Sequence, residues 1–469
     1  MSASHIEIEN RQPGTDDWKL SNVASNCEIE GYASLTSVNA GDEISFFVNT
    51  ADREYTLSVF RMGYYGGLGG RRMTASIKLR GLSQHVTSPD PKTGMTECEW
   101  RDPYAFRVPA EWISGIYLVK LTGLSSLRER YIIFVVRNDG RESDLMLQST
   151  VTTYQAYNAW GGKSLYRFNS TGQSPAVKVS FNRPYDDADG SGMFLRWELD
   201  MIGFLEKEGY DVVYSTNLDT HQSVAVHLRK GFLSVGHDEY WSWEMRQQVQ
   251  GARDRGVSLG FFSANSCYWQ IRLEPSPLTG EPDRTIVCYK IGQYIPASEA
   301  SRDPAAAQPS THYLLTARWR DPHVSVPGNP EDSLIGVMYN ESQPVNADIL
   351  IDETASWVFD DTGLRRGDRL RGLVGYEADR MYGNAPAGTM RLAHSPYRHV
   401  DGTTQYSDMT MYRAASGATV FATGTLQWSF GLCRISPWAA SPSRVNPAAQ
   451  QITRNVLACF AGRSKAKLV

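Results

Sequence analysis

The sequence changes its pattern near residue 145, and this change restricts the possible folds more than any other feature. Before it, strand-length runs rich in β-branched and aromatic residues, such as DEISFFVNT (42–50) and RYIIFVVRN (130–138), alternate with turn residues. After it, apolar runs of strand length alternate with amphipathic segments of helical length. The first pattern is typical of an antiparallel sandwich. The second is typical of a sheet whose parallel strands are joined by helices.

These two patterns predict two domains, with the boundary in the polar stretch RNDGRESD (137–144). We expect residues 1–143 to form an all-β, immunoglobulin-like sandwich. We expect residues 144–469 to form an α/β domain with a mostly parallel, doubly wound sheet. Its strands would include 231–236 and 257–265, and its helices 194–209 and 242–256.

Composition narrows the classes of protein that fit. Hydrophobic residues make up 41% and charged residues 21%, which suits a globular chain with a sizeable core. A net charge of −4 gives no reason to expect a nucleic-acid or membrane partner. No apolar run reaches 18 residues, and the start MSASHIEIENRQPG lacks the regions of a signal peptide, so we expect a cytoplasmic protein. Six cysteines without a CxxC pair argue against a zinc ribbon or a disulfide framework.

Three predicted strands end in polar residues that a simple turn would not need. The motifs are GHDEYW (236–241), SANSCYW (263–269) and VGYEAD (374–379). In open α/β sheets, ligands bind outside the carboxyl ends of the strands. If neighbouring strands bring the three motifs together, a pocket forms that contains an imidazole, carboxylates, an amide and phenols.

Several side chains of these motifs are candidate catalytic residues, and each could have a structural role instead. Glu239 among aromatic residues would have a raised pKa and suit acid–base work. His237 suits the same work or a capping role, and Asp238 suits the start of the following helix. Cys267 is a candidate nucleophile, although Asn265 occupies the expected elbow and no GxSxG is present.

Phenols beside carboxylates also raise the question of a metal. No HExxH or HxH pattern is present. Phenolate and carboxylate oxygens are hard ligands that suit trivalent iron. A phenol with an ordinary pKa of about 10 ionises at neutral pH only when a strongly charged cation displaces its proton.

The motifs TYQAYNAWGGKSLY (153–166), VGHDEYWS (235–242) and GLVGYEADR (372–380) resemble the large, or beta, subunit of N,N-dimethylformamidase and its relatives. The stretch YTLSVFRMGYYGGLGGRR (55–72) resembles the β-sandwich that precedes the catalytic domain in that family. The resemblance implies an α/β domain similar to class I glutamine amidotransferases, without their cysteine nucleophile. It also implies hydrolysis of an unactivated amide by a mononuclear iron (Fe3+) that two tyrosines and one glutamate hold.

Carried over by motif, the resemblance assigns Tyr240 and Glu377 as metal ligands. The family also has a histidine two residues before its glutamate, where this chain has Gly375. The second tyrosine is expected near residue 198, where the chain reads Trp-Glu-Leu-Asp. Either Glu198 or Asp200 supplies the missing oxygen, or Tyr157 does so from the first strand end, or the site is altered.

The leading hypothesis is therefore a metal-assisted hydrolase that cleaves the carbon–nitrogen bond of a small amide. Glu239 or His237 would transfer protons, and Asn265 would donate to the developing oxyanion. Aromatic side chains would line the substrate pocket: Tyr157, Trp160, Trp241 and Trp269.

Two alternatives stay open from the sequence. One is a metal-independent enzyme that uses Cys267 or a pair of carboxylates. The other is a protein that binds a carbohydrate or another ligand in an aromatic cleft. Both a homo-oligomer and a small second subunit are compatible with the chain.

Overall fold

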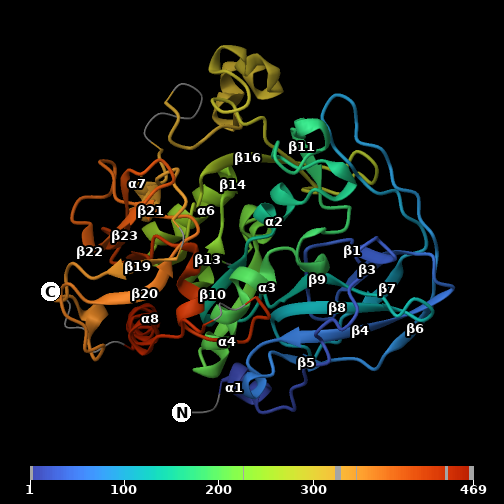
Figure 1. The fold of residues 1–469 in the computed structure, drawn as a ribbon, viewed down its shortest axis with the longest axis horizontal. Coiled ribbons are helices and arrows are strands. Elements are labelled where there is room, and N and C mark those ends of the chain that lie inside the picture. The colour runs from blue at the N-terminus through green and yellow to red at the C-terminus, as the bar shows by residue number, and fades with distance from the viewer. Residues whose placement is uncertain (1–3, 225, 323–328, 345, 439–441, 464–469) are drawn as a thin grey trace.

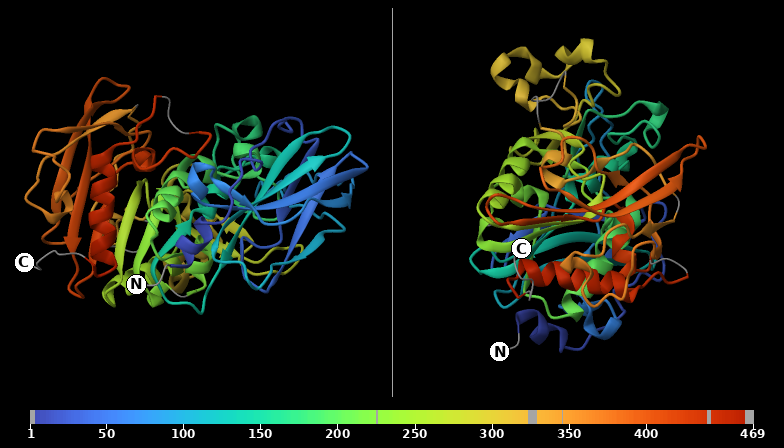
Figure 2. Two further views of the ribbon diagram at one scale, coloured as in Figure 1. Left: turned by 90° about the horizontal axis from the view of Figure 1, so that it is seen from below. Right: turned by 90° about the vertical axis from the view of Figure 1, so that its left-hand side faces the viewer.

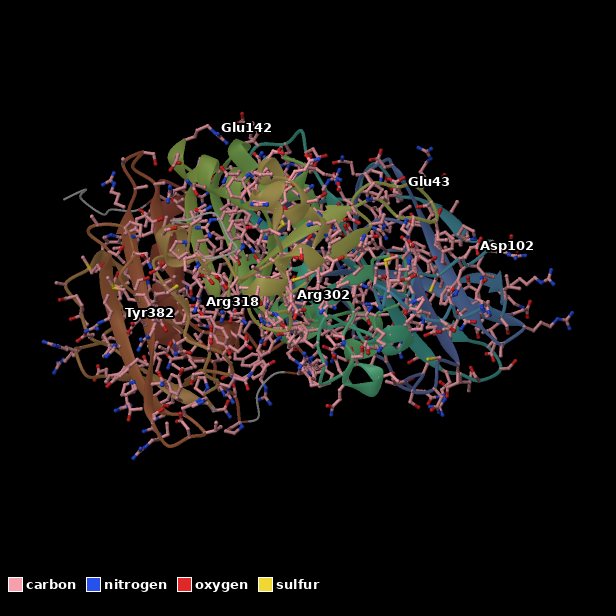
Figure 3. The ribbon with its side chains drawn as sticks, turned by 90° about the horizontal axis from the view of Figure 1, so that it is seen from above. Glu43, Asp102, Glu142, Arg302, Arg318 and Tyr382 are labelled. Carbon is pink, nitrogen blue, oxygen red and sulfur yellow. The ribbon has the colours of Figure 1, made fainter. Side chains whose placement is uncertain are left out.

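The computed structural model describes residues 4–224, 226–322, 329–344, 346–438 and 442–463 (Figure 1). The sheets follow one another across the molecule, from the amino-terminal strands in blue to the carboxy-terminal strands in orange and red (Figure 2). In Figure 3, Glu43 and Asp102 of the amino-terminal part lie toward one end, and Tyr382 of the carboxy-terminal part lies toward the other. Within the described ranges, no helix has both the length and the apolar character needed to cross a bilayer.

The amino-terminal part contains two sheets. Its six-stranded sheet has the order β2-β9-β8-β4-β5, with β6 also paired to β4. Its three-stranded sheet has the order β1-β3-β7. The bounds are β1 Ile29–Ala33, β2 Ser37–Asn39, β3 Glu43–Thr50, β4 Glu54–Met62, β5 Gly70–Arg72, β6 Ile77–Arg80, β7 Tyr104–Arg107, β8 Gly115–Gly123 and β9 Glu129–Arg137. The predicted strands are present, but the parallel pairing of β2 with β9 and the short edges do not confirm an immunoglobulin-like arrangement.

A seven-stranded sheet forms the centre of the molecule, in the order β12-β10-β13-β15-β24-β23-β22. The bounds are β10 Ser143–Ser149, β12 Val212–Thr216, β13 Arg229–His237, β15 Ser258–Ala264, β22 Met390–Arg398, β23 Thr404–Arg413 and β24 Thr419–Ala422. The strands from β12 to β24 are parallel, whereas β24, β23 and β22 pair antiparallel.

The prediction of a mostly parallel, doubly wound sheet is wrong. The central sheet is mixed, and most strand pairs in the described ranges are antiparallel. The reason lies in the connections: only short turns join β22 to β23 and β23 to β24, and a short turn can join only antiparallel neighbours. The α/β part is therefore a mixed structure with a parallel segment at its centre.

Helices cover both faces of this parallel segment. The helices in the described ranges are α1 His5–Asn10, which packs on α4, α2 Val151–Tyr157, α3 Phe194–Trp197, α4 Leu199–Lys207, α5 Asn217–His221, α6 Trp243–Asp254, α7 Asp332–Ile335 and α8 Pro447–Phe460. Alternate residues of β10 point to opposite faces, so Leu145 packs in the core with α4 and α8, and Met146 packs in the core with α6. Ser242 caps α6 as predicted, because its hydroxyl accepts from the backbone N–H of Met245.

Smaller sheets lie beside the central sheet and carry several loops to the site. They are β11 Lys178–Ser180, β14 Tyr240–Ser242, β16 Trp269–Glu274 and β17 Thr285–Val287 in the order β11-β17-β16-β14, and the pairs β18 Met338–Tyr339 with β21 Asp379–Arg380 and β19 Ala347–Leu350 with β20 Arg369–Val374. Three short 3₁₀ segments between residues 297 and 314 project at the top of Figure 1.

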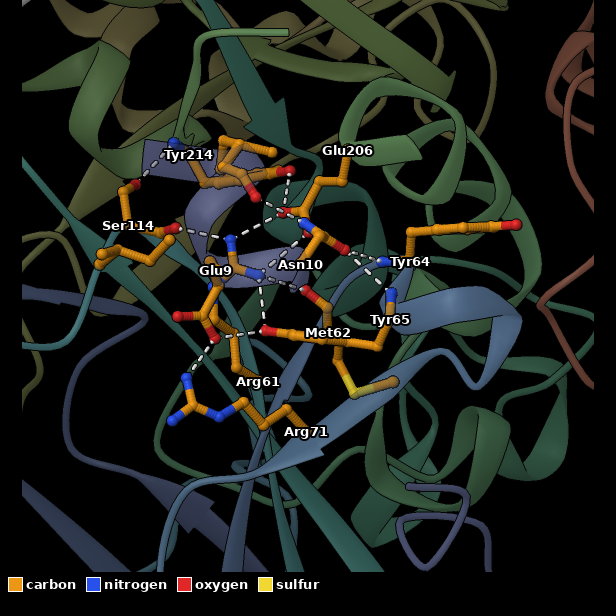
Figure 4. A network of polar contacts seen from close by, with 12 residues as sticks. Glu9, Asn10, Arg61, Met62, Tyr64, Tyr65, Arg71, Ser114, Glu206 and Tyr214 are labelled. Carbon is orange, nitrogen blue, oxygen red and sulfur yellow. Dashed lines mark hydrogen bonds and ion pairs between the residues drawn. The ribbon is translucent and has the colours of Figure 1, made fainter. Parts of the chain in front are cut away.

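A buried polar network joins the amino-terminal part to α4 (Figure 4). Arg61 of β4 forms a two-pronged ion pair with Glu206 of α4, with nitrogen–oxygen distances of 2.7 and 3.0 Å. Both side chains are fully buried. Tyr214 also donates to Glu206, over 2.8 Å, so the carboxylate has partners on both oxygens. Two parallel hydrogen bonds between the guanidinium and the carboxylate fix the orientation of β4 against α4.

Candidate active site

The centre of the candidate site is Glu239, in the short link between β13 and β14. Its side chain is buried. Each carboxylate oxygen accepts a hydrogen bond from one tyrosine hydroxyl: Oε2 from Tyr157 over 2.8 Å and Oε1 from Tyr166 over 2.7 Å. The backbone around it is also fixed, because its N–H donates to Thr153 and its carbonyl accepts from the N–H of Trp269. The protein therefore presents one carboxylate between two tyrosines.

A third phenol adjoins this pair. The hydroxyl of Tyr240 donates to the hydroxyl of Tyr166 over 2.6 Å, and the rings of Tyr157 and Tyr166 lie with centroids 4.3 Å apart. Burial first, and then the negative charge of Glu239, raise the pKa of all three phenols far above the ordinary value. In the absence of a cation, all three are neutral hydroxyls.

His237 connects Glu239 to a second carboxylate. Its Nε2 lies 3.2 Å from Glu239 and 3.0 Å from Glu377. Burial lowers the pKa of His237, but the charges and hydrogen bonds of the two carboxylates outweigh burial and raise it to about 10. At neutral pH the imidazole is therefore a cation. Its Nδ1 has no hydrogen-bond partner among the described residues, although it is buried.

The contact with His237 lowers the pKa of Glu239, whereas it raises the pKa of His237. Burial by itself would raise the pKa of Glu239. The hydrogen bond and charge of His237, together with the charge of Lys290, hold the pKa below its ordinary value. Glu239 is therefore an ionised carboxylate in a buried position.

Asn265 completes this side of the site at the end of β15. Its Nδ2 donates to Glu377 over 3.1 Å and lies 3.5 Å from Nε2 of His237. Its backbone is left-handed, with φ of 49°, and its N–H donates to the buried carboxylate of Asp379 over 2.7 Å. Asp379 thereby fixes the position from which the Asn265 amide reaches Glu377.

A buried lysine lies behind the phenols. Nζ of Lys290 is 3.2 Å from the ring centroid of Tyr166 and 5.2 Å from that of Tyr240. Burial lowers its pKa to about 8, with the charge of Glu239 opposing the shift. Among the described residues, Nζ has no hydrogen-bond partner. Its main interactions are therefore with aromatic faces and with the charge of Glu239.

The sequence model of the family described as "N,N-dimethylformamidase beta subunit-like, C-terminal" matches residues 56–442, well over half of the chain. The chain belongs to this family. No curated protein sequence matches it.

In this member of the N,N-dimethylformamidase beta subunit-like family, the structure brings most of the predicted site residues together. His237 and Asn265 contact Glu377 directly, and His237 also contacts Glu239. Tyr157 and Tyr240 lie on the phenol side. The three motifs therefore lie together, although only two of them end strands of the central sheet and Glu377 follows β20, which pairs with β19. The chemical role of each residue stays a prediction.

Glu198 and Asp200 lie elsewhere. Glu198 accepts from the N–H and hydroxyl of Thr150 and from the hydroxyl of Tyr154. Asp200 accepts two backbone N–H groups at residues 435 and 436, over 2.8 and 2.9 Å. Burial raises the pKa of Glu198 to about 7 and that of Asp200 to about 6. Both carboxylates hold the fold together, and neither contacts the Glu239 cluster.

The tryptophans predicted to line the pocket have different environments. Trp269 packs near the site, with its ring centroid 5.0 Å from Nζ of Lys290. Trp241 is fully buried with Phe232 in the core on the α6 side of the sheet, because alternate residues of β14 face opposite ways. Trp160 packs against Trp100 in a separate aromatic cluster.

Asp238 and Cys267 have roles in the fold that differ from those expected from the sequence. Asp238 does not start a helix: its carboxylate accepts from Gln148, Ser234 and Asn217, and it ties neighbouring strands together. Cys267 is buried, and burial raises the pKa of its thiol to about 12, which disfavours a thiolate nucleophile.

Sequence reasoning did not single out Tyr166 or Lys290 as site residues. Tyr166 lies in a loop after α2, and Lys290 follows β17, so neither occupies a strand end of the central sheet. The only signal for Tyr166 is its place at the end of the family motif at 153–166. Lys290 belongs to none of the motifs, so the sequence does not indicate that it lies at the site.

Proposed function

We propose that this chain is an amide hydrolase that uses trivalent iron, and that Glu239, Tyr157 and Tyr166 hold the ion. The observation that carries the proposal is the pair of phenols that meet the two oxygens of one buried carboxylate. The family to which the chain belongs supports the amide-hydrolase activity. Tyr240 and Glu377, the ligands that the family resemblance implies, lie beside this set, in contact with Tyr166 and His237.

The residues fit the metal by their chemistry. In the part of the chain that the structure describes, no group of three His, Cys, Asp or Glu side chains is placed to hold a metal ion. The cluster around Glu239 is of another kind, because it combines one carboxylate with phenols, which are hard oxygen donors.

Iron, when bound, supplies a Lewis acid that polarises the amide carbonyl and makes water more acidic. The protein's own contribution is electrostatic. The ammonium of Lys290 against the face of Tyr166 favours negative charge on that ring's oxygen. Burial of Glu239 and Lys290 strengthens these interactions.

Proton transfer is assigned to the His237–Glu377 side. One oxygen of Glu377 accepts from Asn265 and His237, so the other is available to take the proton of the attacking water. As the carbon–nitrogen bond breaks, the leaving nitrogen takes its electron pair and needs a proton. His237, whose Nε2 lies 3.0 Å from Glu377, is positioned to donate that proton.

A carboxamide substitution at the centre of the cluster tests the proposal. Purified, iron-loaded protein should release amine from simple formamides or acetamides, and Glu239→Gln should lower kcat by about a hundredfold or more. Glu198→Gln is the matched control, since Glu198 is also buried and also bonded to a tyrosine, but lies outside the cluster. Equal activity of Glu239→Gln and Glu198→Gln would overturn the assignment.

The family description names a beta subunit, so we also propose that the chain assembles with a second subunit. The 52.4 kDa chain should then have a larger mass in solution when it is produced with its partner. Light scattering after size-exclusion chromatography measures this mass. A single 52.4 kDa species under all conditions would contradict the proposal.

A further inference from the structure

A cavity of about 350 Å³ lies on the amino-terminal side of the molecule. Residues of β1 and β3, the stretch 98–100 and the loop at 278–281 line it. Such a volume suits a small organic molecule. The Glu239 cluster contributes no residue to this lining, so the cavity is separate from the proposed reaction centre.

Aromatic side chains form its apolar wall. The rings of Tyr32 and Phe47 are stacked, with centroids 4.9 Å apart and planes 7° apart. Trp100 is tilted by 50° against Tyr32, with a centroid distance of 5.3 Å. The hydroxyl of Tyr32 is fixed by donation to the carbonyl of Cys98. The wall is therefore held in place before any ligand arrives.

The charged side chains that line the cavity are all negative. Glu99 and Glu281 both line it, and its lining contains no lysine, arginine or histidine. Both carboxylates belong to exposed residues, and neither has a side-chain hydrogen bond or ion pair within the described ranges. Unpaired carboxylates beside aromatic rings favour a positively charged ligand and disfavour an anion.

We propose that this cavity binds an organic ammonium ion. Aromatic faces attract cations through the ring quadrupole, and quaternary ammonium groups are recognised in this way. The two carboxylates add attraction for the charge, and Leu35 and Leu278 add apolar contact for its substituents. A carbohydrate would use the aromatic wall but would gain little from the carboxylates.

One tryptophan connects this cavity to the Tyr157 segment. Trp100 packs edge-on against Trp160, with ring centroids 5.9 Å apart. The backbone N–H of Trp160 donates to the side chain of Asn158, which directly follows Tyr157 at the end of α2. Amide hydrolysis releases amines, which are ammonium ions at neutral pH. The binding claim itself does not depend on that activity.

Calorimetric titration of the purified full chain tests the proposal. The probe is choline, and its control is 3,3-dimethyl-1-butanol, which has the same shape without the charge. Choline should bind with a Kd of about 1 mM or tighter, and the neutral molecule should bind about tenfold more weakly. Raising the salt concentration should weaken choline binding, because the carboxylates are exposed.

Two variants place the binding in this cavity. The double variant Glu99→Gln/Glu281→Gln should weaken choline binding about tenfold, and Trp100→Phe should weaken it several-fold because phenylalanine is the poorer partner for a cation. Glu111→Gln, an exposed carboxylate outside the lining, should leave binding unchanged. Near-ultraviolet circular dichroism confirms that each variant is folded.

Three results would overturn the proposal. They are the absence of saturable choline binding, equal binding of the neutral control, and unchanged binding in the double carboxamide variant. Binding of a neutral sugar with equal affinity in that variant would favour the carbohydrate alternative instead. Because the assay measures binding alone, its outcome is separate from the test of amide hydrolysis.

Discussion

Asn265 shows how one residue's backbone determines the geometry of the site. Its left-handed conformation is uncommon for a residue other than glycine, although asparagine tolerates it better than most. The bond from its N–H to Asp379 holds this conformation and directs the side chain to Glu377. Asp379 is thus a positioning residue. Among the described residues, its side chain forms no hydrogen bond to the phenol cluster.

Replacement of Asp379 by alanine should lower kcat by about tenfold while iron content stays unchanged, because only the orientation of Asn265 is lost. Asp379→Asn, whose side-chain oxygen can still accept the N–H, should recover most of the rate. Steady-state kinetics and metal analysis of both variants check this. Loss of iron in Asp379→Ala, or equal rates for the two variants, would contradict the positioning role.

Glu198 gives a prediction about pH and stability. Burial raises its pKa in the folded chain to about 7 from an ordinary value of 4.5, so the folded state binds the proton more tightly than the unfolded state does. The stability that comes from protonated Glu198 is therefore present at low pH and is lost as the pH rises through about 7.

Glu198→Gln should lack this pH dependence, since the amide oxygen accepts the same bonds without titrating. Between pH 5 and pH 8, the free energy of unfolding of the variant should gain about 3 kcal/mol relative to the wild type. Urea unfolding at the two pH values measures the change. Parallel pH profiles for the two proteins would exclude the effect.

At the scale of elements, the ion pair between β4 and α4 sets how the amino-terminal sheets meet the central sheet (Figure 4). Removing one partner leaves a buried, uncompensated charge. Arg61→Met or Glu206→Gln should each lower the free energy of unfolding by roughly 3–5 kcal/mol, and the double variant should lose less than the sum.

The exposed pair of Glu208 with Arg454 provides a control on the same helix end. Glu208→Gln should change the free energy of unfolding by less than about 1 kcal/mol, because solvent screens this pair. Denaturant titration of all four variants measures both effects. If the Arg61 and Glu208 substitutions cost the same, the buried pair does not have the assigned role.

Most individual elements could be predicted from local pattern, whereas their pairing could not. The strands β4, β8, β13 and β15 and the helices α6 and α8 follow the apolar periodicity of the sequence. Burial gives a strand the same apolar appearance whether its neighbour is parallel or antiparallel, so the mixed sheet order was missed. The short turns around β23 were the available evidence for antiparallel pairing.

At the scale of the whole molecule, the site combines segments that lie far apart in the sequence. The meeting of His237 and Asn265 could be predicted because β13 and β15 are neighbours in the central sheet, whereas Glu377 follows β20 of a separate two-stranded sheet. Tyr166 and Lys290 reach the same place from loops, and loop paths depend on tertiary packing. For that reason the sequence did not indicate Tyr166 or Lys290, and the ligand pair Tyr240 and Glu377 that the family resemblance implies stays a prediction.

The central claim is that Glu239, Tyr157 and Tyr166 form an iron site, and the visible spectrum of the purified, iron-loaded protein tests it most directly. The wild type should bind about one iron per chain and show a tyrosinate-to-iron charge-transfer band. Tyr166→Phe and Tyr157→Phe should each weaken or abolish this band, while Tyr154→Phe, which removes a buried tyrosine bonded to Glu198, should leave it unchanged. An active wild type without stoichiometric iron, or an unchanged band in both site variants, would contradict the account.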